Sequence, residues 1–97
     1  MIELRCTVFI DVTLPIVPVN ITRARKYWAC FDTNHNAFYF GKSLLDNYNW
    51  RSIVAHEMVH QWQHEYNSDC DEGHHDRYFY GWHERFHIYN LILQEEM

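Results

Sequence analysis

A chain of 97 residues is long enough for one domain and too short for two, so we expect a single domain over residues 1–97. The net charge is −5 with neutral histidines, and the basic residues cluster only at Arg23–Lys26, which argues against a dedicated nucleic-acid-binding surface. The longest uncharged apolar stretch, Val12–Thr22, contains two prolines and is too short to cross a bilayer, so no membrane segment is expected.

The cysteine pattern indicates a reducing compartment. Cys6, Cys30 and Cys70 stand far apart in the sequence, and no C-x-x-C pair is present. An odd, scattered set of this kind favours free thiols over a disulfide framework. We therefore expect a cytoplasmic protein.

The first segment alternates between apolar and polar residues. Its even-numbered positions are apolar and many of them are β-branched: Ile2, Leu4, Cys6, Val8, Ile10, Val12 and Leu14. A period of two predicts a half-buried strand over residues 2–14. Pro15 and Pro18 then impose an extended or turning path.

Two short aromatic runs follow, at Lys26–Phe31 and Ala37–Phe40. Between them, Asp32–Asn36 is rich in the residues that favour turns, so the pair predicts a β-hairpin that ends at Gly41.

The second half of the sequence predicts helices. Asn49 is a plausible N-cap for a helix over Trp50–Tyr66, and the acidic segment Asn67–Gly73 predicts a loop. A second long helix is expected over His75–Gln94. The predicted class is α+β, with short N-terminal strands and a β-hairpin followed by two long helices.

The most informative motif lies in the first of these helices. His56, Glu57 and His60 form an H-E-x-x-H motif, in which residues four apart lie one above the other and both imidazoles can reach one ion. In a zinc peptidase, the metal activates a water molecule and the carboxylate acts as general base. The motif predicts one Zn²⁺ per chain, with Glu57 as the catalytic residue.

The helical period separates the motif from the apolar residues. At about 100° per residue, the side expected to pack in the core carries Val54, Ala55, Met58, Val59, Trp62 and Tyr66. The other side carries Ile53, His56, Glu57, His60 and His64. The sequence therefore predicts one packing face and one chemical face.

Three residues compete to be the third metal ligand: His74, His75 and Glu84. His75 is favoured because apolar residues follow it at helical spacing, at Phe79, Trp82 and Phe86, and so it begins the inward face of the last helix. Glu84 lies off that face. The remaining histidines of this half are expected at the surface or in packing contacts: His64, His83 and His87.

These residues together resemble the SprT-like family, which includes the Spartan proteases. Members carry H-E-x-x-H and then a third histidine that opens a helix in the pattern H-G-x-x-F. Here His75–Phe79 follows that pattern, with Asp76 in the place of the glycine, fifteen residues after His60. Upstream, Leu14–Val19 and Arg23–Lys26 resemble the segment that leads into the family's β-hairpin. The likeness covers roughly residues 14 to 90.

The resemblance implies a zincin-like fold, peptidase activity, and His56, His60 and His75 as the zinc ligands. The family has a helix before its Leu-Pro segment, where the alternation of this chain favours a strand. The family's frequent C-terminal zinc ribbon or DNA-binding extension has no counterpart in this sequence. DNA is thus a partner by resemblance but is not supported by charge, and the small size would suit a phage-encoded protein acting inside a host cell.

The predicted function is zinc-dependent hydrolysis of peptide bonds in a protein or peptide substrate. The residues that could stabilise the oxyanion are Tyr66, Tyr78, Tyr80 and His74, and the sequence does not choose among them. His74 and Tyr78 are the candidates for an oxyanion or second-shell role. The alternative is a non-catalytic structural zinc module, closed by a fourth ligand among Cys70, Asp71, His74 and Glu84. An aminopeptidase-like site with Glu84 as third ligand fits the helical pattern less well.

Overall fold

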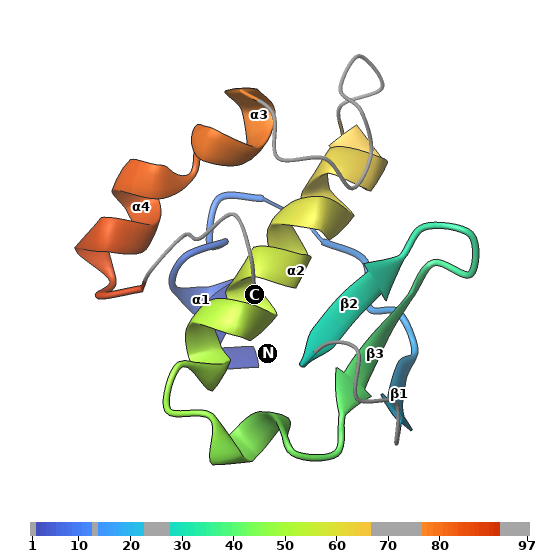
Figure 1. Cartoon of the computed structure of the whole chain (residues 1–97). Coiled ribbons are helices and arrows are strands. Elements are labelled where there is room, and N and C mark those ends of the chain that lie inside the picture. Colours follow the sequence, from blue (N-terminus) through green and yellow to red (C-terminus); the bar gives the residue numbers. More distant parts are fainter. Residues whose placement is uncertain (1, 13, 23–27, 67–76, 92–97) are drawn as a thin grey trace.

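A three-stranded sheet packs against one long helix, and shorter helices lie on the other side of that helix (Figure 1). The computed structural model describes residues 2–12, 14–22, 28–66 and 77–91. In chain order the elements are α1 (Ile2–Cys6), β1 (Val19–Thr22), β2 (Ala29–Asp32), β3 (Ala37–Gly41), the 3₁₀ helix η1 (Leu44–Asp46), α2 (Trp50–Tyr66), α3 (Arg77–Tyr80) and α4 (His83–Ile88). The α+β class predicted from the sequence is confirmed in this coarse form.

The predicted hairpin is present. Strands β2 and β3 pair antiparallel, from Ala29 opposite Phe40 to Asp32 opposite Ala37. The Asp32 carboxylate caps the turn by accepting hydrogen bonds from the backbone N–H groups of Asn34 and His35. Asn36 takes the left-handed conformation at φ 49°, which asparagine tolerates better than most residues.

Strand β1 was not predicted. It lies parallel to β3, so the order in the sheet is β1-β3-β2 and β2 is an edge strand. Residues of β1 are mostly exposed, whereas Ala29 and Phe31 of β2 are buried. The prolines that precede β1 favour an extended backbone, but the sequence does not specify that this segment forms a strand paired with β3.

The predicted strand over residues 2–14 is wrong, because α1 and a series of turns occupy the described part of this segment. Leu4 and Val8 are buried, four residues apart as on a helix, and Phe9 is buried beside them. Ile10, which the alternation would have placed inside, is 70% exposed. A short apolar segment can satisfy both periods, and packing selected the helical one.

Helix α2 has the predicted bounds, and the Asn49 carbonyl accepts the first backbone hydrogen bond, from Ile53. The predicted division into one packing face and one chemical face does not hold, because the chemical face is packed as well. Every residue from Ser52 to Gln61 is buried, because β2 covers one side of the helix and α3 another. Tyr66, predicted to pack, is 52% exposed at the helix end.

The predicted single helix over His75–Gln94 is also wrong within its described part, residues 77–91. Gly81 and Trp82 separate α3 from α4, since glycine costs helical stability and the chain turns tightly there. Asn90, at φ 59°, ends α4: the Leu91 N–H bonds the Phe86 carbonyl and the Asn90 N–H bonds the His87 carbonyl. This pattern is a Schellman motif, which stops a helix.

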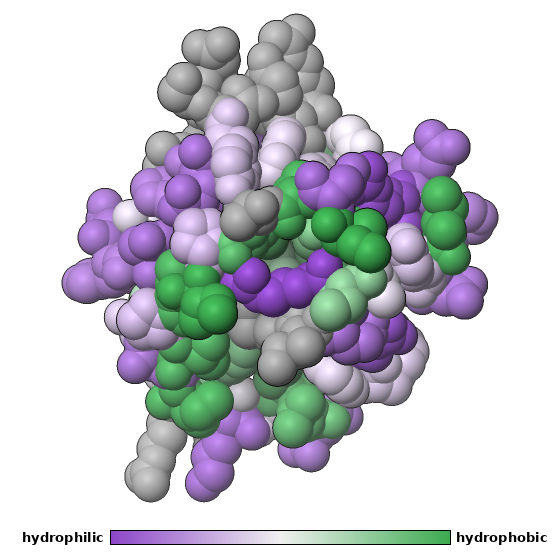
Figure 2. All heavy atoms as spheres, turned by 180° about the vertical axis from the view of Figure 1, so that it is seen from behind, coloured by the Kyte–Doolittle hydropathy of each residue, from purple (hydrophilic) through white to green (hydrophobic). Residues whose placement is uncertain are grey.

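The predicted inward residues of this region, Phe79, Trp82 and Phe86, are nevertheless buried. Trp82 and Phe86 both contact Phe9, which joins the C-terminal helices to the N-terminal segment. On the face opposite to that of Figure 1, hydrophobic and hydrophilic residues surround a central hollow (Figure 2). Within the described ranges, no helix has the length and apolarity needed to cross a membrane.

Candidate metal centre

The middle of α2 brings two imidazoles together. The Nε2 atoms of His56 and His60 lie 3.2 Å apart, and both side chains are almost completely buried. Two nitrogens bound to one tetrahedral zinc at 2.0–2.1 Å would lie about 3.3 Å apart. The spacing of the two histidines therefore already matches that of two ligands of a single ion.

Glu57 lies beside this pair. Its Oε2 is 3.6 Å from His56 Nε2, and its Oε1 accepts a hydrogen bond of 3.0 Å from the backbone N–H of Phe31 in β2. Burial raises the pKa of the Glu57 carboxyl from 4.5 to about 8, although the hydrogen bond from Phe31 acts in the opposite direction. Strand β2 thus supplies the donor that orients a buried acid.

Phe79 of α3 packs against both histidines. Its ring stacks on His60 at 5.1 Å and 22° between planes, and it meets His56 edge-on at 4.9 Å. The prediction that Phe79 is a core residue is confirmed. The core around Phe79 includes the imidazole rings of His56 and His60.

Gln63 was missed by the sequence analysis. It is fully buried, and its Oε1 lies 2.7 Å from Nδ1 of His60. Its position three residues after His60 on the same helix could have indicated this contact, because residues at that spacing are neighbours on a helix surface.

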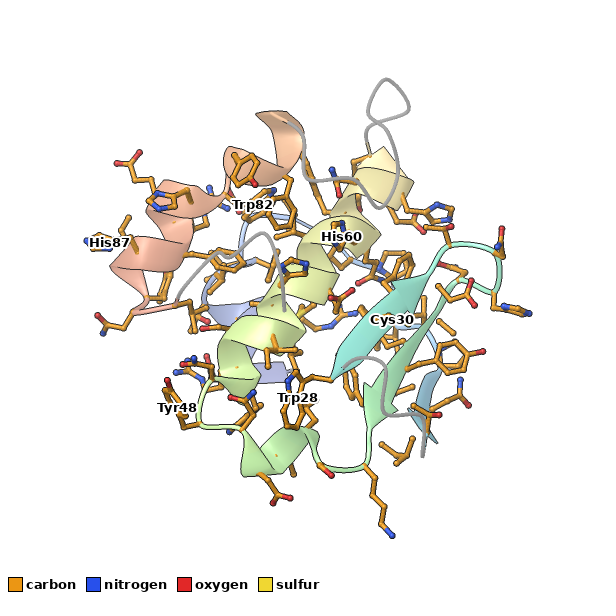
Figure 3. The ribbon with its side chains drawn as sticks, in the orientation of Figure 1. Trp28, Cys30, Tyr48, His60, Trp82 and His87 are labelled. Carbon is orange, nitrogen blue, oxygen red and sulfur yellow. The ribbon has the colours of Figure 1, made fainter. Side chains whose placement is uncertain are left out.

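The other described histidines do not join the site. His64 packs against Phe31, with ring centroids 5.8 Å apart, while His83 and His87 are exposed. Figure 3 shows His60 on α2 in the centre of the molecule and His87 at the far side of α4. These residues confirm the expectation of surface or packing positions.

Several candidates are not brought to the site or lie outside the described residues. Glu84 is exposed on α4, Tyr66 is exposed, and Tyr80 is 41% exposed with its ring against Phe79. The predictions for Cys70, Asp71, His74 and His75 fall in residues 67–76, outside the described part, and so does the side chain of Tyr78.

The three residues of the motif form a donor set that could hold a metal ion. Their ligand atoms all lie within 4.8 Å of one another, and all three side chains are buried. Two imidazoles and a carboxylate, gathered out of contact with water, suit a transition metal such as zinc better than they suit calcium or magnesium.

No protein-family model, curated protein or solved structure matches this chain.

Proposed function

We propose that this protein is a zinc-dependent metallopeptidase with one Zn²⁺ per chain. One observation carries the proposal: the Nε2 atoms of His56 and His60 stand 3.2 Å apart with the Glu57 carboxylate beside them. Two metal ligands and an adjacent buried acid are among the parts that zinc-assisted hydrolysis requires.

His56 and His60 would hold the metal through Nε2. Zinc bound there would supply a Lewis acid that polarises the scissile carbonyl and lowers the pKa of a coordinated water toward neutrality. The surrounding residues exclude bulk water from the donor atoms, since His56 and His60 are only 3% and 6% exposed. A dry surrounding strengthens each electrostatic interaction in the site.

Glu57 would move the proton. Its Oε1 is engaged by the Phe31 N–H, and so Oε2, which faces His56 Nε2, is the oxygen positioned to accept a proton from the attacking water. Glu57 would then donate that proton to the leaving amine, which completes the hydrolysis of the peptide bond. A carboxyl whose pKa is raised toward neutral pH can do both, because it is able to exist in either form there.

His75 is our proposed third ligand. Phe79 packs on both imidazoles, and His75 precedes it by four residues in the sequence, a span short enough for His75 to reach the two proposed donors. His74 and Tyr78 are proposed at the rim of the same site, where an oxyanion or a second-shell contact would need a donor.

A SprT-like, zincin-like assignment is part of this proposal. The resemblance expects a helix before the Leu14-Pro15 segment, and α1 occupies that position although the alternation had favoured a strand. The hairpin followed by the H-E-x-x-H helix fits the same order.

The proposed substrate is a protein or peptide, and binding to DNA is expected to be weak because the net charge is −5. We place the protein in the cytoplasm, or in that of a host cell if it is phage-encoded. The thiol of Cys6 is free and exposed, which supports a reducing compartment.

Replacing Glu57 by Gln tests the proposal. The substitution keeps the shape and both histidines, so zinc content should stay near one equivalent while cleavage of an unfolded protein substrate falls by roughly 100-fold or more, the scale of a lost general base. Zinc content is measured by elemental analysis and cleavage by gel assay. Unchanged cleavage by Glu57→Gln would exclude the proposed mechanism.

A structural zinc module is the second candidate, and the burial of all three motif residues favours it. Such a site is closed by four protein ligands and has no open position. The two candidates differ in Co²⁺-substituted protein: an open site changes its visible spectrum when a small anion is added, whereas a closed site does not. Glu57 weighs against the second candidate, since a structural site has no need of a buried general base.

A further inference from the structure

We infer that Gln63 is a positioning residue of the metal centre, which holds the proton of His60 on Nδ1 and thereby leaves Nε2 ready to bind a metal. The inference rests on the metal-binding part of the proposed function and not on peptidase activity.

The hydrogen-bond chemistry assigns the tautomer of His60. A carboxamide oxygen can only accept, so at 2.7 Å from Gln63 Oε1 the Nδ1 atom of His60 must carry the hydrogen. In a neutral imidazole the other nitrogen then has the lone pair. The neighbouring contact agrees, because His56 can donate from its Nε2 to His60 Nε2 across 3.2 Å.

A metal takes the same lone pair. An imidazole that binds a metal through Nε2 needs its proton on Nδ1, and a partner for that N–H fixes both the tautomer and the ring orientation. Gln63 is fully buried, and so little water competes for this contact. Phe79 stacks on the His60 ring and restrains it from the other side. The ligand is therefore oriented before any metal arrives.

The chain contains a matched control in Gln61. It is as completely buried as Gln63 and lies on the same helix, but its amide nitrogen donates to the Pro15 carbonyl at 2.8 Å. Replacing either glutamine by methionine removes a buried hydrogen bond and nearly conserves volume. Only the change at Gln63 should affect the affinity for metal.

The experiment measures zinc affinity by competition with a chromophoric chelator in four proteins: the wild type, Gln63→Met, Gln63→Glu and Gln61→Met. We expect Gln63→Met to bind zinc roughly 10- to 100-fold more weakly, the usual cost of losing a second-shell partner. Gln63→Glu keeps an acceptor and should bind at least as tightly as the wild type. Gln61→Met should stay within about threefold of the wild type, a margin well below the effect expected at Gln63, although its melting temperature falls.

A second measurement needs no variant. Long-range ¹H–¹⁵N NMR of the metal-free wild type should show the His60 proton on Nδ1, and a proton on Nε2 would overturn the inference. It would also be overturned if Gln63→Met bound zinc as tightly as the wild type, if Gln63→Glu lost as much affinity as Gln63→Met, or if Gln61→Met lost as much. None of these results depends on proteolysis, so a wild type that binds zinc without cleaving any substrate would reject the peptidase and leave the role of Gln63 standing.

Discussion

The two flanks of α2 hold the same cluster in different ways. On the sheet flank, the Phe31 N–H of β2 makes one directional hydrogen bond to Glu57. On the flank of the C-terminal helices, Phe79 touches both imidazoles through ring packing. One flank supplies a donor, and the other supplies shape.

The difference follows from what each group needs. A buried carboxylate lacks the water that would stabilise its charge, and so it depends on a donor nearby. An imidazole that serves as a ligand depends mainly on orientation, which packing restricts. We therefore expect changes on the sheet flank to alter proton chemistry and changes on the helical flank to alter metal retention.

The largest effect is expected at the proposed third ligand. His75→Ala should cost most of the zinc affinity and all detectable activity, whereas His74→Ala should retain metal. The prediction assumes helical geometry, in which adjacent residues differ in direction by about 100° and only one can face the ion. Zinc per chain, measured for both variants after dialysis, checks this, and the reverse result would shift the register of the last segment by one residue.

The sheet flank predicts a pH dependence of the metal-free protein. The pKa of Glu57 is raised in the folded state, so the folded state holds this proton more tightly than the unfolded state does. The resulting contribution to the free energy of unfolding is fully present below about pH 4.5 and is lost as the pH rises to about 8. This change in the pKa of Glu57, from 4.5 to about 8, corresponds to a loss of roughly 5 kcal/mol in the free energy of unfolding. Urea unfolding in the presence of a chelator should show the wild type losing stability over this range relative to Glu57→Gln, and parallel profiles would contradict it.

Two phenylalanine variants distinguish the effect of core packing on stability from its effect on metal binding on the helical flank. Phe79→Ala should destabilise the fold by about 3–5 kcal/mol, as large-to-small changes in cores do, and should also weaken zinc binding because both imidazoles lose a neighbour. Phe86→Ala is the control: Phe86 is equally buried but contacts Phe9. Denaturant unfolding and zinc competition for both variants should give similar losses of stability and a loss of affinity for Phe79→Ala alone.

The smallest effect is expected at a contact remote from both flanks. Arg51 donates to Glu3 at 2.7 Å and ties α2 to α1, but both side chains are about half exposed. Exposed ion pairs contribute about 0–1 kcal/mol. A double-mutant cycle with Arg51→Ala and Glu3→Ala should therefore give a small coupling and unchanged zinc affinity, while a larger coupling would mean that α1 helps to hold the site.

The helix of the motif could be predicted because several local signals agree there. Asn49 precedes it, its length suits a helix, and His56 and His60 have helical spacing. The hairpin was equally local, since the turn residues at Asp32–Asn36 specify it.

The other elements could not be predicted, because they depend on tertiary contacts or on single residues that a hydrophobic period does not take into account. The alternation of the N-terminal segment predicts a strand, but the packing of Leu4 and Phe9 in the core favours a helix and turns there. Gly81 and Asn90 interrupt the last region, although its apolar period continues through them. The partners of Glu57 could not be read from the sequence, because a backbone N–H of β2 carries no side-chain signature.

The burial of α2 also has a consequence for kinetics. From Ser52 to Gln61 the helix is buried by the rest of the protein, so its donor atoms have little contact with solvent unless neighbouring elements separate. A metal bound by His56 and His60 would then leave at a rate set by such openings and not by the strength of the chelator that receives it.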